Sequence, residues 1–226
     1  MNRLSAGQTS FRYFLISIIP LYFCFLIQLS AQQKMIQYDK DFVFKDGIYL
    51  SIFDFKGNKP IPVSKIIFNS NKGDKDFLKY VLDKTTITYL DSTGKLQEVK
   101  TETTWGYCSN GTVYINHGTG FSRLSIIGNI CHFVSTVAVQ TGYDPFSYND
   151  PFGSTYPRYT YVSQQFVMDF DSGKILDFNV GSMEILLQKD DALYKEFTAL
   201  KKKKKRDSIF LYLRKFNEKH PVYFPE

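Results

Sequence analysis

Cysteine and histidine are the side chains of this chain best suited to do chemistry, and there are three of each in 226 residues. Cys108 and Cys131 would form a disulfide in an oxidising compartment if their Cα atoms lay within about 7 Å of each other. Free cysteine is commonly buried, however, so we expect two unpaired thiols in the core. Cys131 and His132 are neighbours in sequence, and neighbouring side chains on a strand point to opposite faces, which argues against a shared metal site.

Sequence motifs for catalysis are absent. No His-Glu-x-x-His, Cys-x-x-Cys, Gly-x-Ser-x-Gly or phosphate-loop pattern occurs. We therefore expect a non-catalytic protein with no cofactor. The alternative is an extracytoplasmic hydrolase with an acid-based site, which would need two carboxylates about 5 to 9 Å apart in a deep pocket.

The start of the chain has the pattern of an export signal. Arg3 and Arg12 are the only charges in the first 31 residues, and the apolar run 13–29 is shorter than the roughly 20 residues of a membrane-spanning helix. Small residues at Ser30 and Ala31 suit signal peptidase. We expect cleavage after Ala31 and a mature chain in the periplasm or at the envelope, with an uncleaved N-terminal anchor as the alternative.

An aromatic segment, residues 142–161, is a candidate interaction surface. It contains five Tyr, two Phe and three Pro, a composition that predicts a loop. Tyr supplies contact area at low entropic cost, so the loop either binds a partner such as an envelope protein or packs on its own sheet. The residues of the candidate surface are Trp105, Tyr143, Phe146, Tyr148, Phe152, Tyr156 and Tyr159.

A basic run lies near the C-terminal end. Residues 195–219 hold ten bases against three acids. An exported chain seldom meets nucleic acid, so the run is expected either to contact anionic envelope lipid, at roughly 1 kcal/mol per base, or to be a solvated hinge. The candidate contacts are Lys201, Lys202, Lys203, Lys204, Lys205 and Arg206.

These residues must be positioned by a single α+β domain, residues 32–226. With 43% hydrophobic and 22% charged residues, the composition excludes a disordered chain and a multi-pass membrane protein. Ser51 can cap a short N-terminal helix. Turn dipeptides such as Asn110-Gly111 divide residues 85–180 into short β-rich runs, which predicts an antiparallel β-meander.

Residues 182–220 have helical spacing, so we expect C-terminal helices. Asp190 can cap one of them. The apolar faces before and after residues 201–206 point in roughly opposite directions, which predicts a break or bend across that segment and a second cap at Asp207-Ser208. The alternative is one long helix packed between different neighbours. The residues compared are Leu193, Phe197 and Leu200 before the run and Ile209, Leu213 and Phe216 after it.

Four stretches carry a resemblance to a known group. They are Lys45-Asp-Gly-Ile-Tyr-Leu50, Trp105-Gly-Tyr-Cys108, Asp169-Phe-Asp-Ser-Gly-Lys174 and Phe210-Leu-Tyr-Leu-Arg-Lys-Phe-Asn217. With them the chain resembles uncharacterised exported proteins of Bacteroidota. The resemblance implies an extracytoplasmic location, one domain and no catalytic residues to carry over. We therefore expect a periplasmic or envelope-associated binding or structural protein.

Overall fold

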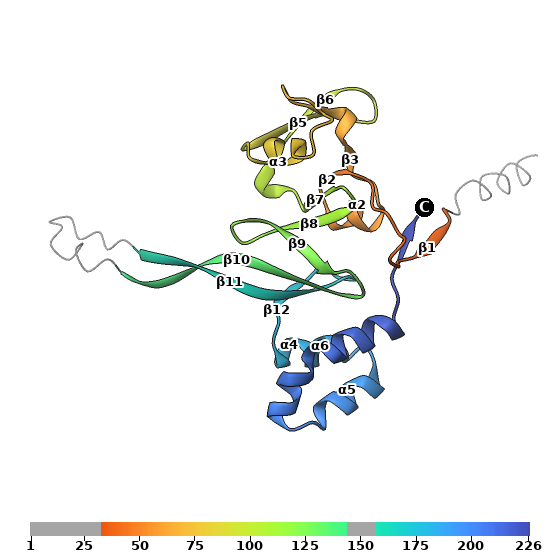
Figure 1. Cartoon of the computed structure of the whole chain (residues 1–226), viewed down its shortest axis with the longest axis vertical. Coiled ribbons are helices and arrows are strands. Elements are labelled where there is room, and N and C mark those ends of the chain that lie inside the picture. The colour runs from red at the N-terminus through yellow and green to blue at the C-terminus, as the bar shows by residue number, and fades with distance from the viewer. Residues whose placement is uncertain (1–32, 144–156) are drawn as a thin grey trace, which may run out of the picture. The chain divides into compact units, whose positions relative to one another are not determined.

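An antiparallel sheet, with the strand order β12-β11-β10-β9-β8-β7-β2-β3, is the centre of the fold (Figure 1). This computed structural model describes residues 33–143 and 157–226, so the predicted signal peptide lies outside the described residues. Residues 36–225 form one compact unit. The strands are β2 (Gly47–Tyr49), β3 (Ile61–Pro62), β7 (Gly106–Ser109), β8 (Thr112–His117), β9 (Gly120–Ile126), β10 (Ile130–Tyr143), β11 (Pro157–Asp169) and β12 (Ile175–Asp177).

Tight turns join the neighbouring strands from β7 to β12, apart from the connection between β10 and β11, so the predicted meander is confirmed. Asn110 and Gly111 both have left-handed backbone, with φ of 51° and 69°. This is the geometry that a two-residue hairpin requires, and Asn-Gly adopts it readily. The described residues therefore have the predicted α+β fold.

Smaller sheets and short helices complete the fold. A three-stranded sheet has the order β4-β5-β6, and β1 and β13 form a two-stranded sheet. Ser51 caps α2 as expected, because its Oγ accepts the Asp54 N–H while the Asp54 carboxylate accepts the Ser51 N–H. The bounds are β1 (Met35–Gln37), α2 (Ile52–Lys56), η1 (Val63–Lys65), β4 (Ile66–Ile67), α3 (Phe77–Leu82), β5 (Thr86–Leu90), β6 (Leu96–Lys100), η2 (Thr101–Thr103) and β13 (Tyr223–Pro225).

Side chains alternate between the two faces of the main sheet, so neighbouring residues enter different cores. Cys131 and Phe133 of β10 enter an aromatic core, whereas Ile130 enters a core formed with the C-terminal helices. On β2, Tyr49 joins the aromatic core and Ile48 packs with α3 in a third core. The sheet thus separates the aromatic core from the other two.

The aromatic core contains a residue from β13. The Phe224 ring lies edge-on to Phe44 at 4.9 Å and contacts Phe55 and Phe170 at 5.4 and 5.6 Å between centroids. Edge-to-face pairs of this kind contribute beyond their buried area. The core therefore joins segments from both ends of the compact unit.

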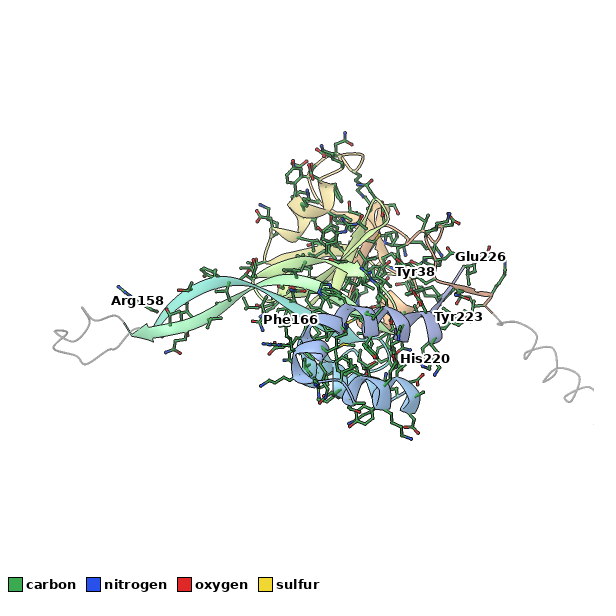
Figure 2. All side chains as sticks on the ribbon, turned by 60° about the horizontal axis from the view of Figure 1, so that its bottom comes forward. Tyr38, Arg158, Phe166, His220, Tyr223 and Glu226 are labelled. Atoms are coloured by element: carbon green, nitrogen blue, oxygen red, sulfur yellow. The ribbon has the colours of Figure 1, made fainter. Side chains whose placement is uncertain are left out.

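Helices α4 (Val180–Leu187), α5 (Asp191–Thr198) and α6 (Lys202–Lys219) form the second core with the β10–β12 end of the sheet (Figure 1). Asp190 caps α5 as predicted, and its carboxylate accepts the N–H of Leu193. It also accepts hydrogen bonds from Lys219 at 2.6 Å and His220 at 2.7 Å. The start of α5 is thereby tied to the end of α6, where Figure 2 labels His220.

The break between α5 and α6 lies between Thr198 and Lys202, at the start of the segment 201–206 and not across it. The expectation of a second cap at Asp207-Ser208 is wrong, because α6 begins at Lys202 and Ser208 is a buried residue inside the helix. The chain turns within the few residues after Thr198, which lets the opposite-facing apolar stripes of α5 and α6 enter the same core. Residues 202–206 therefore form the start of a helix and not a hinge.

Candidate interaction surface

The far part of the β10–β11 hairpin is a two-stranded ribbon, defined as residues 137–143 and 157–164. Figure 2 shows Arg158 toward its far end and Phe166 at its base. On the β9 side, the outermost backbone hydrogen bond to β10 is the one that Thr136 accepts from the Thr119 N–H. On the β12 side, the outermost backbone hydrogen bond to β11 is the one that Gln165 accepts from the Phe178 N–H. Among the described residues, no strand pairs with the outer edges at residues 137–140 and 159–164.

Both faces of the ribbon carry apolar side chains. The register places Val137 opposite Val162 on one face, and Ala138 opposite Tyr161 on the other. Tyr161 is 68% exposed and Tyr159 55%. Arg158 is the only charged residue in the ribbon. The ribbon therefore combines exposed apolar groups with free strand edges and little charge.

Such edges are templates for pairing with another chain. Natural proteins protect long edge strands with charges, bulges or covering elements, and an isolated two-stranded hairpin is only marginally stable in water. The β10–β11 ladder has an irregularity between Gln140 and Gly142 near its end, but 137–140 pairs regularly with 159–162. The arrangement is suited to strand addition, in which main-chain hydrogen bonds give affinity and alternate side chains give specificity.

The predicted aromatic loop is partly strand. Residues 142–143 belong to β10 and 157–161 to β11, because Tyr and Thr favour strands and Pro157 occupies a strand start, where its missing N–H is tolerated. Tyr159 thus lies in the ribbon, while for Tyr143 only the backbone is described. The remaining candidates Phe146, Tyr148, Phe152 and Tyr156 lie outside the described residues.

Trp105 lies with the aromatic core and not with the ribbon. Its ring is half-buried and stacks on Phe55 at 4.4 Å between centroids, with 17° between the planes. Tyr49 approaches it edge-on at 6.1 Å. Val139 was not among the residues named from the sequence, and Tyr161 lay in the aromatic segment without being named as a contact, although both lie in β-rich runs.

Cys108 and Cys131 are free and buried, so the structure contains the expected core thiols and not the disulfide. The Cys108 Sγ lies 3.4 Å from Asp46 Oδ1, and the Cys131 Sγ lies 3.2 Å from the Gly128 carbonyl oxygen. Burial raises the pKa of Cys131 to about 12 and raises that of Cys108 as well. Neither thiol is therefore suited to act as a nucleophile at neutral pH.

The predicted basic contacts occupy the first turns of α6. Lys201 is the N-cap residue and makes no side-chain cap. The Lys205 ammonium lies 2.7 Å from Glu184 on α4, and its side chain is only 16% exposed. In the described part of the chain, Lys202 and Arg206 have no ion-pair partner. Lys205 is thus partly structural, whereas Lys202 and Arg206 are available to a ligand.

A groove of about 910 Å³ is one place where the acid-based site of the hydrolase alternative could lie. Asp83 and Glu102 both line it. A glycosidase-type acid needs a carboxyl group whose pKa is raised by an apolar environment. Asp83 is exposed, while the Glu102 side chain is 74% exposed and lies 3.6 Å from the Lys100 ammonium. These two carboxylates therefore give the hydrolase alternative no support.

Metal binding and membrane crossing can be assessed for residues 33–143 and 157–226. No group of three or more His, Cys, Asp or Glu side chains is placed to hold a metal ion there. None of the helices in that same part of the chain combines the length and apolarity needed to cross a membrane.

Comparison with known proteins gives one match. A family model described as a family of unknown function matches residues 47–220, which is most of the chain. The chain belongs to this family, DUF6563. The DUF6563 match extends from β2 to just after α6, so it includes the ribbon and the basic start of α6. No curated protein and no solved structure matches the chain.

Proposed function

We propose that this DUF6563 protein is an exported, non-catalytic protein that docks on an envelope protein through its ribbon. The observation that carries the proposal is that no strand of residues 33–143 and 157–226 pairs with the ribbon edges at residues 137–140 and 159–164. The partner would offer an extended segment with β-branched or aromatic side chains and little charge. Such a segment would add a strand to one edge and place its side chains against the exposed Val or Tyr residues.

Export is supported by the charged and then apolar start of the chain, which ends at Ala31. Cell fractionation with N-terminal sequencing tests it. We expect a protein that begins at Gln32 in the periplasmic or envelope fraction. Full-length protein in the soluble cytoplasm would overturn export, and full-length protein in the inner membrane would select the uncleaved anchor.

Ribbon docking is tested by photo-crosslinking in cells, with a benzoylphenylalanine in place of Tyr161. Tyr80, which is 48% exposed on α3, gives a matched control position. We expect a discrete crosslinked species from position 161 and none from position 80. Its mass distinguishes an envelope protein from a second copy of this chain. Equal labelling from both positions, or none from position 161, would contradict the proposal.

A charge placed on the ribbon edge provides the second arm of the test. Val139 is 41% exposed, so Val139→Lys should change the free energy of unfolding by less than about 0.5 kcal/mol. The same substitution should remove the crosslink from position 161, because an edge lysine opposes strand pairing. Ile185→Lys on α4, at a side chain that is 55% exposed, is the control and should leave the crosslink intact.

A further inference from the structure

An open cleft of about 640 Å³ lies between the start of α4, the start of α6 and β11. Phe178, Ile209 and Phe210 form its apolar part, and the Phe178 and Phe210 rings meet at 4.6 Å between centroids. His132 lies against both rings at about 5 Å and is 5% exposed. Burial lowers the pKa of His132 and so favours the neutral imidazole. The apolar residues of the cleft therefore lie against a buried ring and not against an exposed charge.

Two of the residues that line the cleft are cationic. Lys202 and Arg206 both line it and are four residues apart on α6, so they lie on the same face of the helix, one turn from each other. Ile209 and Phe210 continue that face into the apolar part. Gln165 and Asn179 are the polar uncharged lining residues, and no described acidic side chain lines the cleft.

The backbone adds to this positive character. The cleft is lined by Val180 and Gly181, whose N–H groups are in the first turn of α4. The first turn of α6 holds several lysines and no acid. Cations at the positive end of a helix dipole are unfavourable. A bound anion would offset the unfavourable position of these lysines. Locally unfavourable arrangements of this kind are common at functional sites.

We propose that this cleft binds a single acyl chain that carries an anionic head, such as a long-chain fatty-acid carboxylate. The head would be held between Lys202 and Arg206, and the chain would lie along Phe178, Ile209 and Phe210. The volume of about 640 Å³ is within the range of roughly 300 to 1,000 Å³ typical of small-molecule sites. The charge of the lining selects an anion, and its apolar part selects a hydrocarbon chain.

The test is isothermal titration of the purified protein with sodium oleate, at concentrations below micelle formation. We expect saturable binding. The double variant Lys202→Gln, Arg206→Gln should bind at least about tenfold more weakly, since it loses both charge-assisted contacts to the head. The matched control is Lys203→Gln, Lys204→Gln, which removes the same charge from the same helix at residues that do not line the cleft. It should bind oleate within about twofold of the wild type.

Two further ligands separate the contributions of head and chain. Oleyl alcohol has the same chain without the charge, so it should bind the wild type as weakly as oleate binds the Lys202, Arg206 variant. Vesicles of phosphatidylglycerol test general attraction to an anionic surface. The proposal is overturned if oleate does not bind saturably, if both double variants lose binding equally, or if only the vesicles bind. Ribbon variants such as Val139→Lys should bind oleate normally.

Discussion

Asn217 of α6 pins the helix to the beginning of β10, and its loss should destabilise the protein measurably. The side-chain oxygen accepts the Ile130 N–H at 2.8 Å, and the side-chain nitrogen donates to the Ile130 carbonyl at 2.8 Å. The single amide thus satisfies both backbone groups of a residue that is 1% exposed. Asn217→Ala would leave both groups without their partner.

A buried backbone group left unpaired costs about 1 to 3 kcal/mol. Asn217 itself is only partly buried, so water can reach one side of the gap, and we expect a total loss of about 2 to 3 kcal/mol. For a chain of this size that loss corresponds to a fall in Tm of roughly 4 to 12 °C. Asn217→Asp keeps the acceptor for the Ile130 N–H but loses the donor, so it should give an intermediate loss.

Urea unfolding followed by tryptophan fluorescence measures this loss. The one Trp, Trp105, stacks in the aromatic core and reports on unfolding far from the substitution. Glu218→Ala, at the exposed next residue, is the control and should stay within about 0.5 kcal/mol of the wild type. If Asn217→Ala also stays within that margin, the pairing with Ile130 does not hold α6 in place.

Three other predictions concern local features. Gly106→Ala should prevent correct pairing of β7 with β8, because the new Cβ would clash with the Tyr114 carbonyl oxygen. Soluble yield and the circular dichroism spectrum test this, and a native spectrum would contradict it. The hydrogen bond from Lys219, more than any other contact, lowers the pKa of Asp190. The ionised Asp190 carboxylate therefore stabilises the fold above about pH 4, and this stabilisation is lost as the pH falls further. Asp190→Asn should therefore have a lower Tm than the wild type at pH 7, with a difference that shrinks below about pH 4; a constant difference would refute the ion pair. With no reductant present, iodoacetamide should label Cys108 and Cys131 in the denatured protein and not in the native protein, and peptide mass spectrometry detects the label. A disulfide would prevent labelling of both the native and the denatured protein.

Local turn chemistry accounts for most of what the sequence predicted about the fold. Asn110-Gly111 and the Ser51–Asp54 capping box each act within a few residues, so they can be recognised without knowledge of the tertiary structure. The predicted position of the break before α6 was wrong. The apolar stripes indicate that the chain changes direction between the two helices, but they do not indicate at which residue. That position depends on how α5 and α6 pack in one core, which is a non-local property.

The candidate surfaces were predictable only in part. Tyr159 and the basic run were identified by composition, but the free edges of the ribbon depend on where β9 and β12 end, which no local pattern encodes. The same limit applies to the cleft, since Phe178 and Phe210 meet only after the helices pack against the sheet. The Asn217 contact with Ile130 spans 87 residues and has no local signature at all.

The place of Phe224 in the aromatic core has a consequence for the timing of folding. Phe44 and Phe55 are synthesised early, yet their ring partner Phe224 and the neighbouring Val222 leave the ribosome more than 160 residues later. The aromatic core cannot close on a nascent chain that still lacks β13. For the proposed route across a membrane this delay is an advantage, because a translocation channel requires an unfolded chain. Closure of the core would then be one of the last steps, completed on the far side.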